Sequence, residues 1–155
     1  MKIRDRTAPK ASNYAMEVLL IDDQAVTVQV YAAIVRRTFA GARVDIAMDL
    51  TEGLQIAAHR KIDLVLLDLQ LQNSGGVQTL HKFLRAAPAI PVLVVAAAED
   101  RDTIHACLKA GAVGYVPKTS ALATLRGALE KVAAGTLYIP PEAGAPPLKP
   151  AANGN

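Results

Sequence analysis

The chain has 155 residues, 52% of them hydrophobic and only 4% aromatic, which fits one domain with an aliphatic core of the kind found in helix-covered parallel sheets. No apolar run approaches the roughly 18 residues that cross a bilayer, and the polar N-terminus does not resemble a signal peptide. The one cysteine, Cys107, has no disulfide partner, which fits a reducing compartment, so the sequence predicts a cytoplasmic protein. The net charge of +3 lies entirely in the first ten residues, which carry four basic side chains and one acidic one, and this predicts a solvated tail over residues 1–15 rather than a nucleic-acid-binding surface.

Short runs of branched aliphatic residues recur along the chain and alternate with amphipathic segments. Runs of this kind predict β-strands that are buried on both faces, as in a parallel sheet. The expected strands cover residues 18–21, 43–47, 64–67, 92–95 and 113–116. The connections between them are too short to hold a second domain, so the alternation predicts one α/β domain with a doubly wound parallel sheet.

The segments between the strands carry apolar residues at helical spacing, and each predicts one helix with an inward face. The second helix is expected to begin at Asp49, the fourth at Asp100 or Asp102, and the last at Ser120, because these residue types cap helix N-termini. Gly111 is the expected end of the fourth helix, since glycine takes the left-handed conformation cheaply. The expected inward-facing residues are, in chain order, Val26, Val30 and Ile34; Leu50, Leu54 and Ala58; Val77, Leu80 and Leu84; Ile104 and Leu108; and Leu122, Leu125, Leu129 and Val132.

The composition changes after residue 135. Residues 136–155 contain five of the nine prolines and many alanines. Such a segment buries little apolar surface, which predicts a linker or a disordered tail. A linker in this place suggests that a further domain once followed, or follows in the parent protein.

Charged residues follow three of the expected strands. Asp22 and Asp23 come directly after the first strand, Asp68 directly after the third, and Lys118 just beyond the fifth. In an open α/β sheet, ligands bind outside the carboxyl ends of the strands, so we expect these side chains to lie together. Asp68 would be the nucleophile of a phosphoryl transfer, and the Asp22–Asp23 pair would hold Mg²⁺. Lys118 would pair with a phosphoryl oxygen. Taken singly, each residue is explained as well or better by a turn, a helix cap or a surface lysine, and only the combination favours this chemistry.

These residues lie in motifs that resemble those of a known family. The motifs are Leu-Ile-Asp-Asp at 20–23, Asp-Leu-Val-Leu-Leu-Asp-Leu at 63–69 and Gly-Ala-Val-Gly-Tyr-Val-Pro-Lys at 111–118. The chain resembles the receiver domain of bacterial two-component response regulators, the CheY-like family, and is most similar to its NarL/FixJ (LuxR-type) branch. The resemblance implies a flavodoxin-like (βα)5 fold over residues 16–135 with strand order 2-1-3-4-5. It also implies a regulatory phosphoacceptor, with self-phosphorylation and dephosphorylation chemistry only, rather than an enzyme.

The resemblance gives each site residue a role. Asp68 would accept the phosphoryl group from a phosphohistidine on a sensor histidine kinase or a phosphotransfer protein. Lys118 would contact the phosphoryl group. Mg²⁺ would be the cofactor, and its protein ligands would be Asp23 directly, Asp22 mainly through water, Asp68, and the backbone carbonyl of Gln70.

Three positions bear on how phosphorylation would be transmitted. The family usually has Ser or Thr 22 residues before Lys118, where the hydroxyl bonds the phosphoryl group, and this chain has Ala96 there. Gln72 stands four residues after Asp68, where the family usually has proline. Tyr115 matches the aromatic residue whose rotamer reports activation, although a partly buried tyrosine at the sheet edge explains it equally well. We therefore expect a site that can be phosphorylated but that shifts its conformation less than a relative with Ser or Thr.

The resemblance also implies partners. These are the sensor kinase or phosphotransfer protein and, as a further option, a second receiver docked through the first and last helices. DNA would be bound only by an output domain outside this chain, and no membrane contact is expected.

Two alternatives stay open. A pseudo-receiver would use the fold as a phosphorylation-independent interaction module. A phosphatase of the haloacid-dehalogenase type would also use a strand-end Asp, but it needs a second Asp two residues later, where this chain has Gln70.

Overall fold

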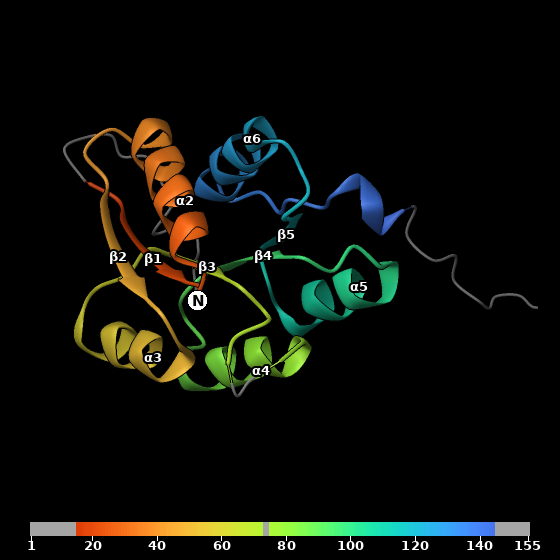
Figure 1. Cartoon of the computed structure of the whole chain (residues 1–155), viewed down its shortest axis with the longest axis horizontal. Coiled ribbons are helices and arrows are strands. Elements are labelled where there is room, and N and C mark those ends of the chain that lie inside the picture. Colours follow the sequence, from red (N-terminus) through yellow and green to blue (C-terminus); the bar gives the residue numbers. More distant parts are fainter. Residues whose placement is uncertain (1–14, 73–74, 145–155) are drawn as a thin grey trace, which may run out of the picture.

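The computed structural model describes residues 15–72 and 75–144, which form an open sheet of five parallel strands (Figure 1). The strands are β1 (Glu17–Ile21), β2 (Arg43–Ala47), β3 (Leu64–Leu67), β4 (Val92–Ala96) and β5 (Gly114–Pro117). Their order in the sheet is β2-β1-β3-β4-β5, with all neighbours parallel. The predicted doubly wound fold and its strand order are confirmed, and each strand differs from its expected range by at most one residue at either end.

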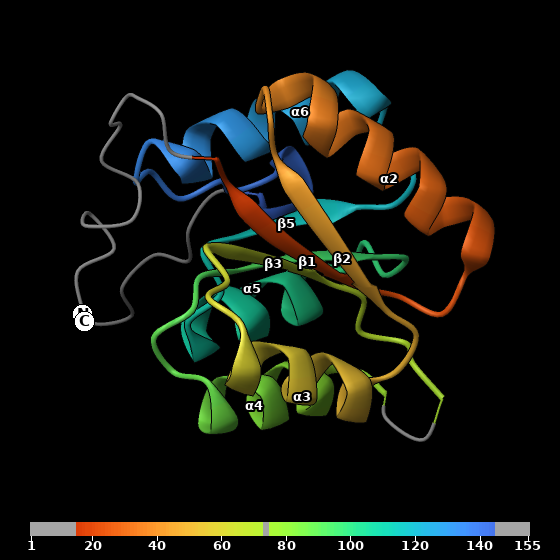
Figure 2. The same cartoon turned by 90° about the vertical axis from the view of Figure 1, so that its left-hand side faces the viewer.

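Within the described residues, α-helices cover both faces of this sheet (Figure 2). The helices are α2 (Ala25–Thr38) and α6 (Leu122–Ala133) on one face, and α3 (Leu50–His59), α4 (Val77–Ala86) and α5 (Arg101–Ala110) on the other. Successive residues of a strand point to opposite faces, so each strand feeds two cores. In β1, Val18 and Leu20 lie in the cluster beneath α2 and α6, whereas Leu19 and Ile21 lie in the cluster beneath the other three helices.

The register of the strands aligns their carboxyl ends. Ile21 of β1 lies beside Ala47 of β2 on one side and beside Leu67 of β3 on the other. The next residues, Asp22 and Asp68, therefore leave neighbouring strands at the same edge. Their N–H groups continue the ladder, because Asp22 N donates to the Ala47 carbonyl at 3.1 Å and Asp68 N donates to the Ile21 carbonyl at 3.0 Å. The fold thus fixes both carboxylates at one edge through backbone bonds.

Two of the predicted helix caps are found and one is wrong. Asp49 and Asp100 cap α3 and α5, and each side chain accepts a hydrogen bond from the backbone N–H three residues later, at 2.8 and 2.9 Å. Ser120 does not cap α6. Its N–H donates to the Pro117 carbonyl at 2.9 Å, so Ser120 lies in the turn that ends β5, and Ala121 is the cap without a side-chain bond.

The inward face predicted for α2 is also wrong. Val26 is 77% exposed and Val30 is 37% exposed, and of the three residues expected inside only Ile34 packs against the core. The residues that α2 buries are Val28, Ala32 and Val35. Both sets have helical spacing, so periodicity alone does not decide which of them faces the sheet. Among the other expected inward residues, Leu122 and Ala58 are exposed as well.

The segment after α6 packs against the edge of the sheet. We call residues 136–144 the C-terminal strap. Tyr138 forms a parallel β-bridge with Gly114, with backbone bonds of 3.0 and 3.2 Å to the residues on either side of this glycine. The strap then forms a short 3-10 helix, η1 (Pro141–Ala143), whose last residue is fully buried against α5. The composition predicted a linker here, but this stretch completes the edge of the domain (Figure 1).

The two ends of the chain, residues 1–14 and 145–155, lie outside the described residues, and so do most of the expected basic tail and the rest of the expected linker. Within the described part, no helix has the length and apolar character needed to cross a membrane.

Candidate functional site

Three carboxylates meet at the carboxyl edge of the sheet. Asp22 and Asp68 are buried, each 4% exposed, and Asp23 is half-buried. One carboxylate oxygen from each residue lies within 4.8 Å of the other two. Like charges this close raise one another's energy, so the cluster favours a bound cation. Carboxylate oxygens are the hard ligands that Mg²⁺ prefers, and the donor set therefore fits this ion.

Lys118 supplies the protein's own positive charge to this cluster. It follows β5, and its Nζ lies 2.9 Å from Asp22 Oδ2 and 3.2 Å from Asp68 Oδ2. Its backbone N–H donates to the Ala96 carbonyl at 2.7 Å, which holds the end of β5 beside the end of β4. The structure thus brings together Asp22, Asp23, Asp68 and Lys118, the four residues that the sequence placed at this edge.

Three carboxylates share one ammonium at the cluster, so negative charge is in excess there. Burial raises the pKa of Asp68 above its usual range, and the bond from Gln70 N together with the charge of Lys118 offsets only part of this rise. Burial lowers the pKa of Lys118, but the hydrogen bonds and charges of Asp22 and Asp68 outweigh burial, so the net pKa of Lys118 is raised. The shift of Lys118 shows that the surrounding carboxylates stabilise a positive charge at this place, and the shift of Asp68 shows that burial makes its negative charge costly without a partner.

Gln70 and Gln72 lie in the loop that follows β3. The N–H of Gln70 donates to Asp68 Oδ1 at 3.1 Å, so one oxygen of this carboxylate is held by the loop while the other faces Lys118. The side chains of both glutamines are exposed.

The residue at the end of β4 is the alanine that the sequence indicated. Ala96 is 1% exposed, pairs in register with Pro117 of β5, and has only a methyl group to offer. The neighbouring residues on either side, Val95 and Ala97, also lack a hydroxyl. Thr103, the next hydroxyl along the chain, lies in the first turn of α5, where its N–H is bound to the capping aspartate.

Tyr115 is fully buried rather than partly buried, and its role in reporting activation stays a prediction. Its hydroxyl donates to the Ala98 carbonyl at 2.6 Å, so the ring points inward and ties β5 to the loop after β4. Burial raises the pKa of this phenol, and nearby negative charges add to the rise. A second bond, from Thr119 Oγ1 to Glu99 Oε2 at 2.9 Å, joins the same two loops, and no sequence signal indicated it.

Gln24 is a further member of the site that sequence reasoning missed. Its Oε1 lies 3.0 Å from Lys118 Nζ, across 94 residues of sequence. Glutamine has no characteristic spacing or strand-end signature. Only its place directly after the Asp22–Asp23 pair could have marked it.

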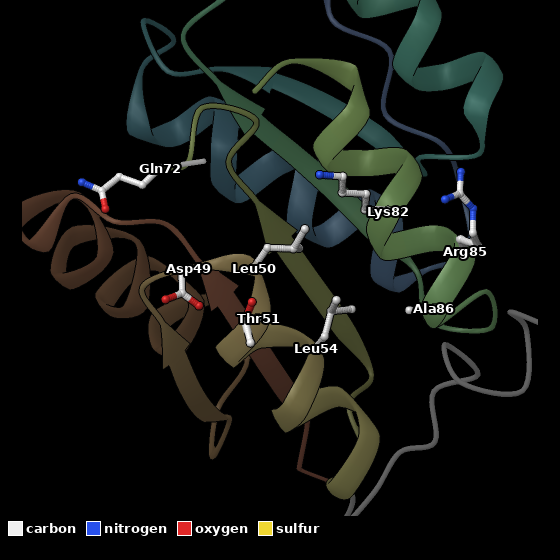
Figure 3. A pocket seen from close by; sticks show the side chains of 8 residues that line it. All are labelled: Asp49, Leu50, Thr51, Leu54, Gln72, Lys82, Arg85 and Ala86. Carbon is white, nitrogen blue, oxygen red and sulfur yellow. The ribbon is translucent and has the colours of Figure 1, made fainter. Parts of the chain in front are cut away.

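A separate groove of about 600 Å³ lies between α3 and α4, away from the carboxylates (Figure 3). Its floor carries Leu50 and Leu54 of α3, and α4 contributes two basic residues on the opposite side. The lining residues are Asp49, Leu50, Thr51, Leu54, Gln72, Lys82, Arg85 and Ala86. The groove holds one carboxylate, Asp49, which is engaged as the cap of α3, so the groove offers no metal site.

The fold and the strand-end carboxylates together define a CheY-like receiver, since parallel sheets of this order place their ligands at the carboxyl edge. The chain belongs to the response regulator receiver domain family, which matches residues 18–130. The glycerol metabolism activator of Pseudomonas putida is 30% identical over 127 residues, covering 81% of this chain and 58% of that protein. Response regulator GacA of Pseudomonas aeruginosa is 36% identical over 89 residues, covering 57% of this chain and 42% of GacA.

Solved structures agree with this assignment. A LuxR family two-component response regulator from Aurantimonas sp. SI85-9A1 superposes with a TM-score of 0.76 at 26% identity, covering 84% of this chain and 93% of that one. A LuxR family DNA-binding response regulator from Silicibacter pomeroyi gives 0.71 at 26% identity, covering 81% and 97%. The chain spans about half the length of the curated relatives it matches. Receiver domains are regulatory modules of two-component systems and generally bind Mg²⁺ at an acidic pocket, which here corresponds to the cluster of three aspartates.

Proposed function

We propose that Asp68 is the phosphoacceptor of this receiver and that a histidine kinase or a phosphotransfer protein is the donor. The observation that carries the proposal is the Lys118 ammonium within hydrogen-bond reach of both Asp22 and Asp68 at the carboxyl edge. In the transfer, a carboxylate oxygen of Asp68 forms a bond to phosphorus, the P–N bond of the phosphohistidine breaks, and the imidazole nitrogen keeps the electron pair. Lys118 then pairs with a phosphoryl oxygen in place of a carboxylate oxygen.

Mg²⁺ is the proposed cofactor. Asp22, Asp23 and Asp68 would hold it, because one carboxylate oxygen of each lies within 4.8 Å of the other two. The backbone carbonyl of Gln70, in the loop that follows Asp68, would complete the protein ligands. When bound, the ion neutralises charge on the phosphoryl oxygens and so lowers the cost of bringing a phosphate to a carboxylate.

We further propose that the receiver acts within a longer cytoplasmic protein and controls a DNA-binding output domain. The names of the relatives support this, since one is an activator and another a DNA-binding response regulator.

A homodimer through α2 and α6 is the proposed mode of assembly. It is supported by Val26 and Val30 on α2 and Leu122 on α6, which are 77%, 37% and 48% exposed. Arg37 and Arg126 flank the groove between the same two helices.

A second candidate function is a pseudo-receiver that binds its partners without phosphorylation. Ala96 favours it, because the residue at the end of β4 has no group to report a phosphoryl group on Asp68. The inward position of Tyr115 favours it as well, since the Ala98 carbonyl already holds the hydroxyl at 2.6 Å.

One experiment separates the two functions. The chain is incubated with Mg²⁺ and phosphoramidate or acetyl phosphate, and its intact mass is measured by mass spectrometry. The phosphoacceptor predicts one added phosphoryl group, which should be absent in Asp68→Asn and absent when the metal is chelated before the donor is added. A wild-type chain that stays unlabelled with both small donors and with a panel of phosphorylated kinases would establish the pseudo-receiver instead.

A further inference from the structure

Gln24 occupies a place where a different residue type is usual. It is the N-cap of α2, a position that favours Ser, Thr, Asp and Asn, and its side chain makes no capping bond to the helix. The side chain reaches Lys118 instead, with 3.0 Å between Oε1 and Nζ. The backbone N–H of Gln24 donates to Asp22 Oδ1 at 2.9 Å. Its side chain and its backbone N–H are therefore both bonded to the phosphoacceptor site, although neither caps a backbone N–H of the helix that it begins.

The bonds to Gln24 also fix which way its amide points. An ammonium group can only donate, so the atom that faces Lys118 is the amide oxygen and not the nitrogen. The hydroxyl of Thr27 also donates to this oxygen, at 3.2 Å. The NH₂ group is consequently turned away from the lysine, and among residues 15–72 and 75–144 it has no acceptor. Gln24 thus presents an unused pair of N–H donors at an exposed rim of the site.

The ammonium of Lys118 is fully occupied. Its N–H groups have three acceptors, which are Asp22 Oδ2 at 2.9 Å, Asp68 Oδ2 at 3.2 Å and Gln24 Oε1 at 3.0 Å. Two of them are charged and belong to the carboxylate cluster, and the third is neutral. If Lys118 bonds a phosphoryl oxygen, it gives up a bond to Asp22 or Asp68. It can keep the bond to Gln24, because Gln24 is not one of the carboxylates that the phosphoryl group replaces.

A phosphoryl group on Asp68 has three terminal oxygens that need partners. Lys118 serves one, and the cation held by the aspartates serves another. The end of β4 gives no donor for the third, because Ala96 offers a methyl group. Gln24 and Asp68 bond the same ammonium, so the NH₂ group of Gln24, which has no acceptor among the described residues, is an unused side-chain donor beside the site.

We propose that Gln24 binds the phosphoryl group on Asp68: its amide oxygen keeps Lys118 over the site, and its amide N–H donates to the phosphoryl oxygen that the alanine at the end of β4 leaves without a partner. The inference rests on the proposed role of Asp68. It assigns Gln24 a role in binding and positioning the group rather than in breaking bonds.

The test uses the whole chain and two probes. Phosphoramidate labels Asp68 as its carboxylate oxygen bonds to phosphorus and the P–N bond breaks, with ammonia leaving and keeping the electron pair. Beryllofluoride, in the presence of Mg²⁺, binds without a covalent step, and its affinity is read from backbone amide shifts in a titration. The variants are Gln24→Ala, Gln24→Glu, Ala96→Ser and the double variant Gln24→Ala/Ala96→Ser. Gln29→Ala is the matched control, since Gln29 is an exposed glutamine of the same helix.

We expect Gln24→Ala to weaken beryllofluoride binding about fivefold, the size of one exposed hydrogen bond, while Gln29→Ala leaves it unchanged. Gln24→Glu keeps an oxygen for Lys118 but removes the NH₂ donors and adds a negative charge, so it should bind more weakly than Gln24→Ala. Ala96→Ser should restore the affinity in the Gln24→Ala background by more than it raises the affinity of the wild type. If Gln24 had only a structural role, the effects of the two substitutions on affinity would add. Non-additive effects therefore distinguish phosphoryl binding from a structural role.

The outcomes separate the inference from the function beneath it. A wild-type chain that neither accepts a phosphoryl group nor binds beryllofluoride overturns the role of Asp68. A wild type that does both, with Gln24→Ala equal to it, overturns the role of Gln24 alone. A loss in Gln24→Ala that Ala96→Ser does not restore also overturns it, because Gln24 would then not stand in for the missing donor.

Discussion

Replacing Gly114 with alanine tests whether the C-terminal strap belongs to the folded domain. A Cβ at this position would lie 2.9 Å from the Tyr138 carbonyl oxygen and 3.0 Å from Tyr138 Cβ, closer than side chains normally approach. It would also lie 2.9 Å from Leu93 Cδ1, but that methyl group can swing away, whereas the Tyr138 carbonyl is backbone. The strap must therefore move out, and the bridge with bonds of 3.0 and 3.2 Å is lost.

The cost of this change follows from what the strap contributes. Two backbone hydrogen bonds at about 1 kcal/mol each, plus partial exposure of the buried Ala143, give a loss of about 2–3 kcal/mol. For a domain of this size the midpoint of thermal unfolding should fall by roughly 10 °C. Circular dichroism measures the midpoint, and hydrogen exchange of the Tyr138 amide reports whether the strap has detached.

Gly127→Ala is the matched control. Gly127 lies within α6, and a Cβ there would meet no atom within 4 Å. Alanine is favoured over glycine inside a helix by about 0.5–1 kcal/mol, so this variant should be stabilised. The same substitution is thus expected to have opposite signs at the two positions. A Gly114→Ala chain that melts at or above the wild-type temperature would refute the account of the strap.

Three further predictions concern single contacts. Tyr115→Phe leaves the Ala98 carbonyl without its 2.6 Å partner and should lower the free energy of unfolding by about 1–2 kcal/mol in urea, whereas an unchanged value would mean that water replaces the hydroxyl. Asp49→Ala removes the cap of α3 and should cost about 1 kcal/mol, with Asp49→Asn close to wild type because asparagine caps equally well. Burial raises the pKa of the Cys107 thiol to about 11, so at pH 8 iodoacetamide should modify the folded chain roughly 100-fold more slowly than the unfolded chain. The rate of modification should rise with pH until the thiol ionises, and rapid alkylation at pH 8 would contradict this burial.

The sheet and its acidic edge could be predicted because the signals for them are local. Each strand is a short aliphatic run, and the side chain that follows a parallel strand must emerge at the carboxyl edge. Asp22 and Asp68 are therefore placed by their neighbours in the sequence. The face of α2 is different, since Val26 and Val28 both begin sets with helical spacing. Only the packing of α2 against the sheet, which buries Val28, Ala32 and Val35, decides between the two sets.

Gln24 and the strap could not be predicted for a related reason. The role of Gln24 depends on Lys118, which lies 94 residues away, and no local pattern connects them. The strap is rich in proline, and composition alone indicates a linker. Its docking depends on the missing side chain of Gly114 and on the buried position of Ala143, which are features of the folded edge.

Tyr115 links the parts of the domain that lie between the site and the strap. Its N–H donates to the strap at Tyr138, its hydroxyl donates to Ala98 in the loop after β4, and its ring lies in the core. The Thr119–Glu99 bond holds the same loop to the end of β5. The position of this loop is therefore set by hydrogen bonds to β5 and to the residue that follows it, and none of these bonds involves a carboxylate of the cluster. Ala96 has no hydroxyl that could bond a phosphoryl group and pull the loop away from these contacts. We therefore expect phosphorylation of Asp68 to change the hydrogen bonds at the carboxylate cluster more than the conformation of the α5 face.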